Sequence, residues 1–231
     1  FSLNQSNPFI QPISTPSQQL GKGDWCILGG KPGISGHVDT ILRKHARVRL
    51  KWNVLAYGGF GKTSKELRPG SSLFESTFSK TNKQRASVVV VCAGSNDAKR
   101  GLSGDDTMSN LQEICENLSR RGLLVYVVDL PNTRGGKHIN LSKLPNKLLR
   151  EYLNRVGNKA MDKDEQLTIF PSVKLSLFQL KSLFNDYTGG LTSKGHKQFA
   201  TRLMDDLLPG IARVEFRKWS RMLVGSRSKK K

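Results

Sequence analysis

The chain has 231 residues, of which 36% are hydrophobic, and this is enough to bury the core of one globular domain. Its formal net charge is +20, because 38 Lys and Arg residues stand against 18 Asp and Glu residues. A single-signed charge of this size destabilises a compact fold unless a polyanion neutralises it, so we expect nucleic acid or an acidic membrane surface as the partner. The sequence contains no apolar run of about 18 residues, the length that a membrane-spanning helix requires.

Polar segments flank the predicted domain, which we place over residues 24–224. Residues 1–23 hold three prolines and many Ser, Asn and Gln residues, so they contain too little apolar surface to repay the entropy of ordering. We predict a disordered linker or arm there, and a flexible basic tail over residues 225–231. Because the chain opens with Phe1 and no signal-like apolar block follows, we expect a fragment of a longer protein.

The three cysteines, Cys26, Cys92 and Cys115, lie within apolar patterns and are odd in number. Their spacing fits neither a zinc site nor a disulfide framework. We therefore expect buried thiols in a reducing compartment, with no metal and no cofactor.

Strand and helix patterns alternate along the domain. Apolar runs and period-two patterns predict strands over 25–28, 48–54, 87–93, 123–130 and 167–170. Helical spacing predicts helices over 38–46, 146–156, 175–184 and 193–208. It predicts a further helix that begins after Asp105 and Asp106 and stops at Gly122. The strand SVVVVCA (87–93) is a continuous β-branched run, as in a central parallel strand. The alternation predicts an α/β three-layer sandwich, in which a five-stranded parallel flavodoxin-like sheet of order 2-1-3-4-5 carries helices on both faces.

Glycine-rich or polar loops follow the first three predicted strands. They are GGKPG (29–33), YGGFGKTS (57–64) and GSND (94–97). Because sites in such sheets lie at the carboxyl ends of the strands, we expect these loops to converge.

The second loop also resembles a phosphate-binding P-loop. The run AYGGFGKTS (56–64) approximates GxxxxGK[ST] with Ala56 in place of the first Gly, and Asp129 could supply the acidic strand end. However, Pro69 and Gly70 follow within two turns, which leaves little room for the helix that must hold the phosphate. We keep an NTPase as the weakest alternative.

In their order, the loops resemble those of the SGNH hydrolases, also called GDSL-like esterases, over most of residues 24–208. The GSND block (94–97) matches the GxND motif of that family, so the resemblance places Asn96 in an oxyanion hole. Gly61 falls at the position of the second oxyanion-hole residue. The resemblance implies the fold described above.

The catalytic positions of the family are altered in this chain. Lys31 stands where the family carries its nucleophilic Ser, and Gly190 stands where it carries the catalytic His. The acid position falls on Tyr187, with Asp186 beside it. Acyl transfer needs an activated nucleophile next to a base, so we expect no enzymatic activity and treat these positions as a degenerate active site.

A hydrolase with a rearranged site is the main alternative. Ser35 lies four residues beyond Lys31, and His196 lies six residues beyond Gly190, so this pair would have to take over the two missing roles. We expect His196 instead on the surface or half-buried face of a helix.

Basic residues are frequent in the predicted loops and in the helix that follows residue 193. Such side chains bind phosphates through charge and counterion release. The residues that we expect to contact RNA are Lys62, Lys65, Arg68, Lys99, Arg100, Lys194 and Arg202. Four aromatic residues, Tyr57, Phe60, Tyr187 and Trp219, could stack on bases of a single strand, although we expect most of them in the core.

An inactive SGNH-like scaffold with this charge resembles the C-terminal domain of insect germ-plasm organisers. The resemblance rests on LGGKPG, YGGFGKTSKELRPG, CAGSNDAKR and DYTGGLTSKGHKQFA. It implies a non-enzymatic, cytoplasmic domain that binds mRNA, including maternal messages, in the ribonucleoprotein granules of the germ plasm. Other granule proteins would then be further partners.

Overall fold

A single parallel sheet organises the chain. The computed structural model describes residues 24–28, 32–57, 61–78, 86–130, 143–162, 168–174, 183 and 191–228. Within these ranges the strands are β1 (Asp24–Leu28), β2 (Asn53–Tyr57), β3 (Val88–Val91), β4 (Leu124–Val127) and β5 (Ile169–Pro171). All the pairings are parallel, and the order is β2-β1-β3-β4-β5, as the sequence predicts.

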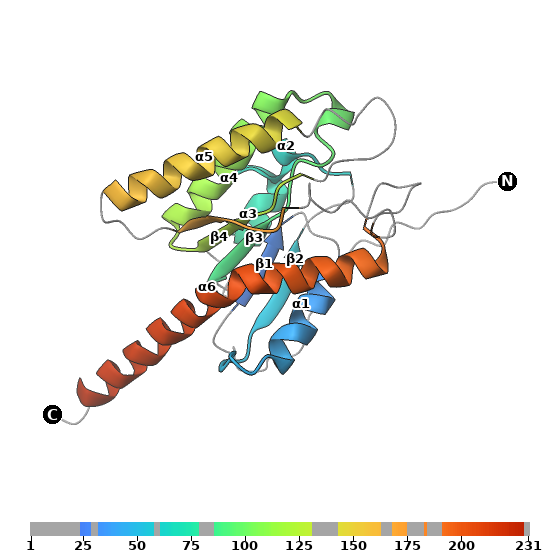
Figure 1. Ribbon diagram of the computed structural model, residues 1–231. Coiled ribbons are helices and arrows are strands. Elements are labelled where there is room, and N and C mark those ends of the chain that lie inside the picture. The colour runs from blue at the N-terminus through green and yellow to red at the C-terminus, as the bar shows by residue number, and fades with distance from the viewer. Residues whose placement is uncertain are drawn as a thin grey trace.

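The described helices cover both faces of the sheet (Figure 1). Helices α1 (Pro32–Lys44) and α6 (Ser193–Ser228) pack against each other and form one layer. The opposite layer contains α2 (Ser64–Leu67), α3 (Ser72–Phe78), α4 (Gly104–Arg120) and α5 (Lys143–Asp162). None of the described helices has the length and apolar character needed to cross a membrane.

Strand β3 separates the two halves of the hydrophobic core. Val88 and Val90 contact the cluster beneath α1 and α6, whereas Val89 and Val91 contact the cluster beneath α4 and α5. This division follows from the pleat, which points successive side chains to opposite faces. All four valines are 0% exposed, so β3 is the central covered strand that its sequence predicts.

Several predicted helix boundaries were wrong. Helix α4 begins at Gly104, ahead of the predicted start, because Ser103 and Asp106 form a capping box at its N-terminus. Helix α5 extends beyond the predicted 146–156 at both ends, and the short helices α2 and α3 were not predicted. The helix predicted over 175–184 lies outside the described residues, except for Leu183.

The second strand begins later than its period-two pattern predicts, at Asn53 and not at Val48. The buried carboxylate of Glu215 accepts hydrogen bonds from the backbone amides of Arg49 (3.1 Å) and Leu50 (2.9 Å) and from the indole N–H of Trp52 (2.9 Å). Amides that donate to a side chain cannot also donate to a neighbouring strand. The chain therefore joins the sheet only after Trp52.

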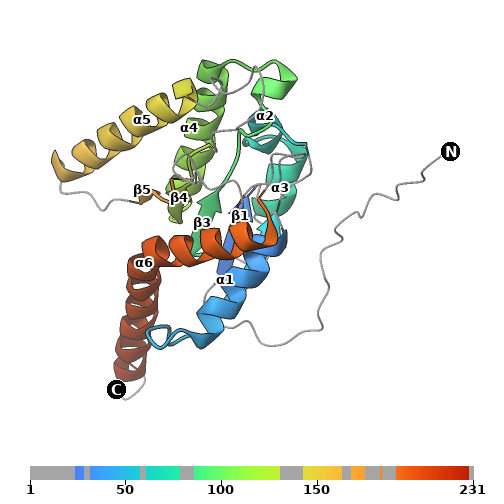
Figure 2. The ribbon, with the colours of Figure 1, turned by 45° about the vertical axis from the view of Figure 1, so that its right-hand side comes forward.

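Helix α6 continues for 20 residues beyond the predicted end at residue 208 and contains Pro209. A proline inside a helix removes a backbone hydrogen bond and bends the helix. Figure 2 shows that α6 turns sharply, so that its C-terminal half projects from the domain. The bend lies over β4, because Gly210 is in contact with the Tyr126 hydroxyl, which also forms a hydrogen bond with the Gly210 backbone.

Substitution of Gly210 tests this close contact at the bend. A Cβ atom at Gly210 would clash with the Tyr126 hydroxyl oxygen, so we expect Gly210→Ala to lower the free energy of unfolding by about 1–3 kcal/mol. Adding Tyr126→Phe should recover part of the loss. In α5, a Cβ at Gly157 would meet nothing within 4 Å, so Gly157→Ala should be neutral or stabilising by about 0.5–1 kcal/mol. Urea denaturation of the wild type and the three variants measures these effects, and equal values for the two single alanine variants would contradict the proposed contact.

Candidate functional site

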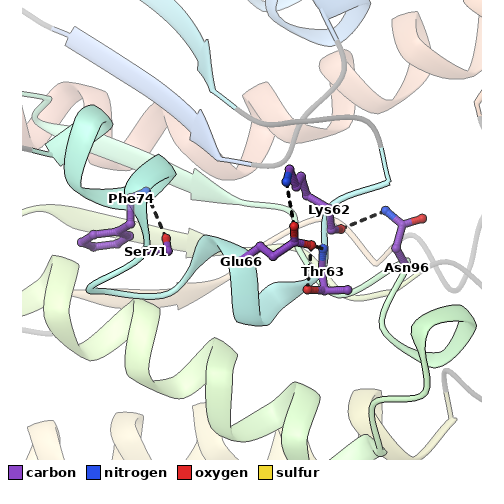
Figure 3. Close-up of polar contacts among 6 residues, drawn as sticks. All are labelled: Lys62, Thr63, Glu66, Ser71, Phe74 and Asn96. Carbon is purple, nitrogen blue, oxygen red and sulfur yellow. Dashed lines mark hydrogen bonds and ion pairs between the residues drawn. The ribbon is translucent and has the colours of Figure 1, made fainter.

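The loops after β2 and β3 meet at the carboxyl edge of the sheet. The side-chain amide of Asn96 donates a hydrogen bond to the backbone carbonyl of Lys62, at 3.0 Å (Figure 3). The second and third predicted loops therefore converge. Residues 29–31 of the first loop lie outside the described residues.

A buried carboxylate locks these two loops together. Asp97, which is 1% exposed, accepts a hydrogen bond from the Ser64 amide at 2.7 Å and a second one from the Ser64 hydroxyl. Asn110 on α4 donates to the same hydroxyl oxygen at 3.0 Å. A charge-assisted network of this kind is stable only when its members are satisfied, so these three residues fix α2 relative to β3 and α4.

A second carboxylate forms hydrogen bonds within the loop after β2, on the side that is exposed to solvent. The Glu66 carboxylate accepts hydrogen bonds from the Lys62 ammonium (2.7 Å) and from the Thr63 amide (2.9 Å), as Figure 3 shows. These bonds, led by the one from Lys62, lower the pKa of Glu66 to about 2. Glu66 therefore stays ionised at neutral pH, and its contribution to stability is present above the ordinary carboxyl pKa and is lost as the pH falls towards 2.

These contacts disfavour the P-loop alternative. Phosphate binding at a helix N-terminus needs amides that point at the ligand. Here the Ser64 amide donates to Asp97, the Thr63 amide donates to Glu66, and the Lys62 ammonium is paired with Glu66. Helix α2 is also only four residues long.

Gly61 and Asn96 match the oxyanion-hole positions. Each of them lies close to the loop that carries the other. Gly61 adopts a φ of 72°, a left-handed conformation that favours glycine, and the guanidinium of Arg100 lies next to it. Asn96 is half-buried and uses one amide hydrogen for the Lys62 carbonyl. The two positions could polarise a carbonyl only with the second amide hydrogen of Asn96 and the Gly61 N–H.

The other positions that we predict to be degenerate, Lys31, Asp186 and Gly190, lie outside the described residues. The alternative pair can be placed. His196 lies in the first turn of α6, half-buried, and its imidazole packs against Gly33, where a Cβ would be 2.7 Å from Nδ1. Ser35 lies two residues further along α1 and is also half-buried. The structure thus brings His196 to the helix that carries Ser35.

The seven predicted RNA contacts are all exposed, but the structure separates them into groups. Lys62, Lys65 and Arg68 lie on or beside α2. Lys99 and Arg100 form part of the short helix η1 (Ala98–Arg100) after β3. Lys194 and Arg202 lie on α6, which packs on the opposite face of the sheet from α2.

Carboxylates partly neutralise the α2 group. Besides the Lys62–Glu66 pair, Arg68 lies 3.9 Å from Glu113. Hydrogen bonds from Ser103, and to a smaller extent the charge of Lys65, lower the pKa of Asp106. By contrast, Lys99, Arg100 and Lys194 form no ion pair with a carboxylate in the described part of the chain. These three cations are available to an external anion.

The chemistry of the other candidate groups is limited. Burial raises the pKa of the Cys115 thiol to about 12, so this cysteine is a poor nucleophile at neutral pH. Within the described ranges, no three His, Cys, Asp or Glu side chains are grouped so that they could hold a metal ion.

Sequence reasoning missed the residues that lock the loops. The pattern Thr63-x-x-Glu66 is a capping-box signature and could have located α2. The roles of Asp97 and Asn110 had no such signal, because their partner Ser64 is 33 and 46 residues away in the chain.

No protein-family model and no curated protein matches the sequence. Solved structures do match its fold. An acetyl esterase mutant with acetate ion superposes with a TM-score of 0.61 at 12% identity and covers 83% of this chain and 99% of its own. A lipase/acylhydrolase from Enterococcus faecalis has a TM-score of 0.57 at 15% identity over 81% of this chain and 96% of its own. A lipolytic protein of the G-D-S-L family from Desulfitobacterium hafniense has a TM-score of 0.51 at 12% identity, covering 84% and 99%.

At these identities, the likeness concerns the fold alone. The chain has an SGNH hydrolase-like, or GDSL-like, α/β fold. The scaffold that the loop order suggested is therefore confirmed, while the activity of these structures does not transfer to this chain by similarity.

The Asp97 lock gives a stability test. We expect Asp97→Asn to lower the free energy of unfolding by about 1.5–3 kcal/mol, because a neutral amide would replace a carboxylate that accepts two hydrogen bonds from Ser64. The exposed Asp205 on α6 is the matched control, and Asp205→Asn should change stability by no more than about 0.5 kcal/mol. Urea denaturation measures both free energies of unfolding. If Asp97→Asn left the free energy of unfolding unchanged, the network would not be what holds the loops.

Proposed function

We propose that this chain is a non-catalytic RNA-binding domain on an SGNH hydrolase-like scaffold. It holds single-stranded mRNA through phosphate contacts at the carboxyl edge of the sheet. The observation that carries the proposal is a set of exposed cations, Lys99, Arg100 and Lys194, that pair with no carboxylate of the described residues, in a chain with a net charge of +20.

The position of these cations supports the proposal. Helix η1 is the next element after β3, and the first turn of α6 lies against the first turn of α1, which is the next element after β1. In a parallel sheet these segments share one edge, so the three cations belong to the carboxyl edge, the rim at which the resemblance implies a degenerate active site. Fixed positive charges along a rim bind a phosphate backbone and release its counterions.

The biological context of the proposal comes from the sequence. The motifs quoted above resemble the C-terminal domain of Oskar, a germ-plasm organiser. On that basis the RNA ligands would include the 3′ untranslated regions of maternal messages, in cytoplasmic granules of the germ plasm.

Charge reversal at the rim tests the RNA site. We expect Lys99→Glu with Arg100→Glu to weaken binding of an oligouridylate. The salt dependence of log Kd should fall by about one for each phosphate that the variant no longer binds. Fluorescence anisotropy over a series of salt concentrations measures both effects.

A matched control separates a local site from overall charge. Arg155 and Lys159 are exposed on α5, and reversing both produces the same change in net charge. If Arg155→Glu with Lys159→Glu reduced affinity and salt slope as much as the rim variant, the RNA would be held by diffuse charge and the proposed site would be wrong.

A second candidate function is a hydrolase with a rearranged active site. Two observations favour it: the structural neighbours described above are esterases and lipases, and His196 packs against the helix that carries Ser35. A Ser–His pair within hydrogen-bond reach is the minimum arrangement for nucleophilic catalysis. Gly61 and Asn96 would then serve as the oxyanion hole.

Covalent labelling distinguishes the two candidates. Without catalysis, a serine-directed fluorophosphonate should leave the protein unmodified, and small acyl esters should not turn over above the rate of a Ser35→Ala variant. Mass spectrometry of the intact chain and its peptides reads the label. Modification of Ser35 that requires His196 would establish the hydrolase and overturn the non-catalytic assignment.

A further inference from the structure

The projecting half of α6 exposes aromatic side chains to solvent. Phe216 is 64% exposed, Trp219 is 54% exposed and Met222 is 46% exposed. They follow one another at intervals of three residues, so they share one side of the helix. The rings of Phe216 and Trp219 lie 6.1 Å apart between centroids, tilted by 39°. Large apolar side chains grouped in this way on a protein surface indicate a binding site.

The same helix is anchored firmly to the domain within the two turns before Trp219. Ile211, Val214 and Glu215 are buried, and the Glu215 carboxylate holds the backbone of residues 49 and 50. Phe216 follows Glu215 directly, and Trp219 lies one helical turn beyond it. Both rings are exposed although Glu215 is buried, so the exposed aromatic surface begins where the anchor ends.

Positive charge surrounds the two rings. Arg213, Arg217, Lys218 and Arg221 lie within the same turns, whereas Glu215, the only carboxylate side chain between residues 207 and 231, is turned towards the core. Burial and the neighbouring Arg217 lower the pKa of Arg213, as expected where cations crowd together. Lys218 lies 5.7 Å from the centre of the Trp52 ring. The surface thus combines exposed aromatic faces with concentrated positive charge.

We propose that Phe216 and Trp219 form a stacking platform for the bases of single-stranded RNA, beside cations that hold the adjoining phosphates. This inference rests on the proposed function and adds a second binding region, remote from the carboxyl edge. Base stacking on aromatic side chains is tolerant of sequence, so the platform contributes affinity for single strands without selecting a base.

Two other occupants fit the surface less well. A second copy of the chain would bring four more cations against the same four, and like charges across an interface oppose association. An anionic membrane would accept the charge, but interfacial helices bury a long apolar face. Over residues 211–222 that face would consist of only three exposed large apolar side chains, because Ile211 and Val214 pack against the domain.

The test compares single-stranded and duplex RNA in the full chain. We expect Phe216→Ala with Trp219→Ala to weaken binding of an oligouridylate of about 20 nucleotides by roughly fivefold to hundredfold. The salt slope should stay unchanged, because no charge is removed. Affinity for duplex RNA, whose bases are stacked internally, should also be unchanged. Both residues are exposed, so thermal unfolding should match that of the wild type.

Two single variants sharpen the result. Trp219→Phe keeps an aromatic face and should retain most of the affinity, while it abolishes the quenching of indole fluorescence by the bound oligouridylate. Met222→Ala removes an exposed apolar side chain from the same side of the helix and should leave RNA affinity unchanged. Equal losses for Met222→Ala and Trp219→Ala would indicate general apolar docking and would overturn the stacking platform.

The remaining outcomes separate this inference from the proposed function. If the wild type binds the oligouridylate and the double alanine variant binds it equally well, the platform is wrong and the rim site stands. If the wild type binds no RNA, both fail. Loss of binding to phosphatidylserine vesicles, or of a concentration-dependent dimer in sedimentation, with unchanged RNA affinity would assign the aromatic surface to a membrane or to a second copy, and would overturn the inference.

Discussion

The burial of β3 on both faces determines where the other elements can lie. Its four valines supply apolar surface to both halves of the core, so a helical layer must cover each side of the sheet. All the strands run parallel, and their carboxyl ends therefore open on one edge. The loops after β2 and β3 and the first turns of α1 and α6 meet at this edge, although residues 33 and 196 are far apart in the chain.

Charge at that edge is distributed more selectively than the composition suggests. Asp97 and Glu66 accept the hydrogen bonds of the backbone amides at the start of α2. Glu66 also forms an ion pair with the ammonium of Lys62. A cation that already has a carboxylate must exchange one partner for another when it meets a phosphate, and the gain is correspondingly small. The net charge draws a polyanion towards the domain, while the local pairs determine which side chains can hold it.

The sheet was predictable because its signals are local. A β-branched run marks β3, and the alternation of strands and helices indicates a parallel sheet covered on both faces. The start of β2 was not predictable, because it depends on Glu215, 166 residues from Arg49. The exposure of Trp219 was likewise not predictable, since an aromatic residue at helical spacing is usually part of a core. Its exposure follows from the passage of α6 through Pro209, where the sequence pattern predicts an end. Of the site, Gly61 and Asn96 could be located from the loop order, but the pairing of Lys62 could not.

The Glu215 anchor has a consequence for where the domain ends. A fragment that stopped after the bend in α6 would lose the acceptor for the amides of Arg49 and Leu50 and for the indole of Trp52. Three donors would then lack this acceptor, and one of them belongs to Trp52, which is part of the hydrophobic core. The projecting helix is therefore part of the folding unit. Its removal would first destabilise the segment that leads into β2, more than 160 residues earlier in the chain.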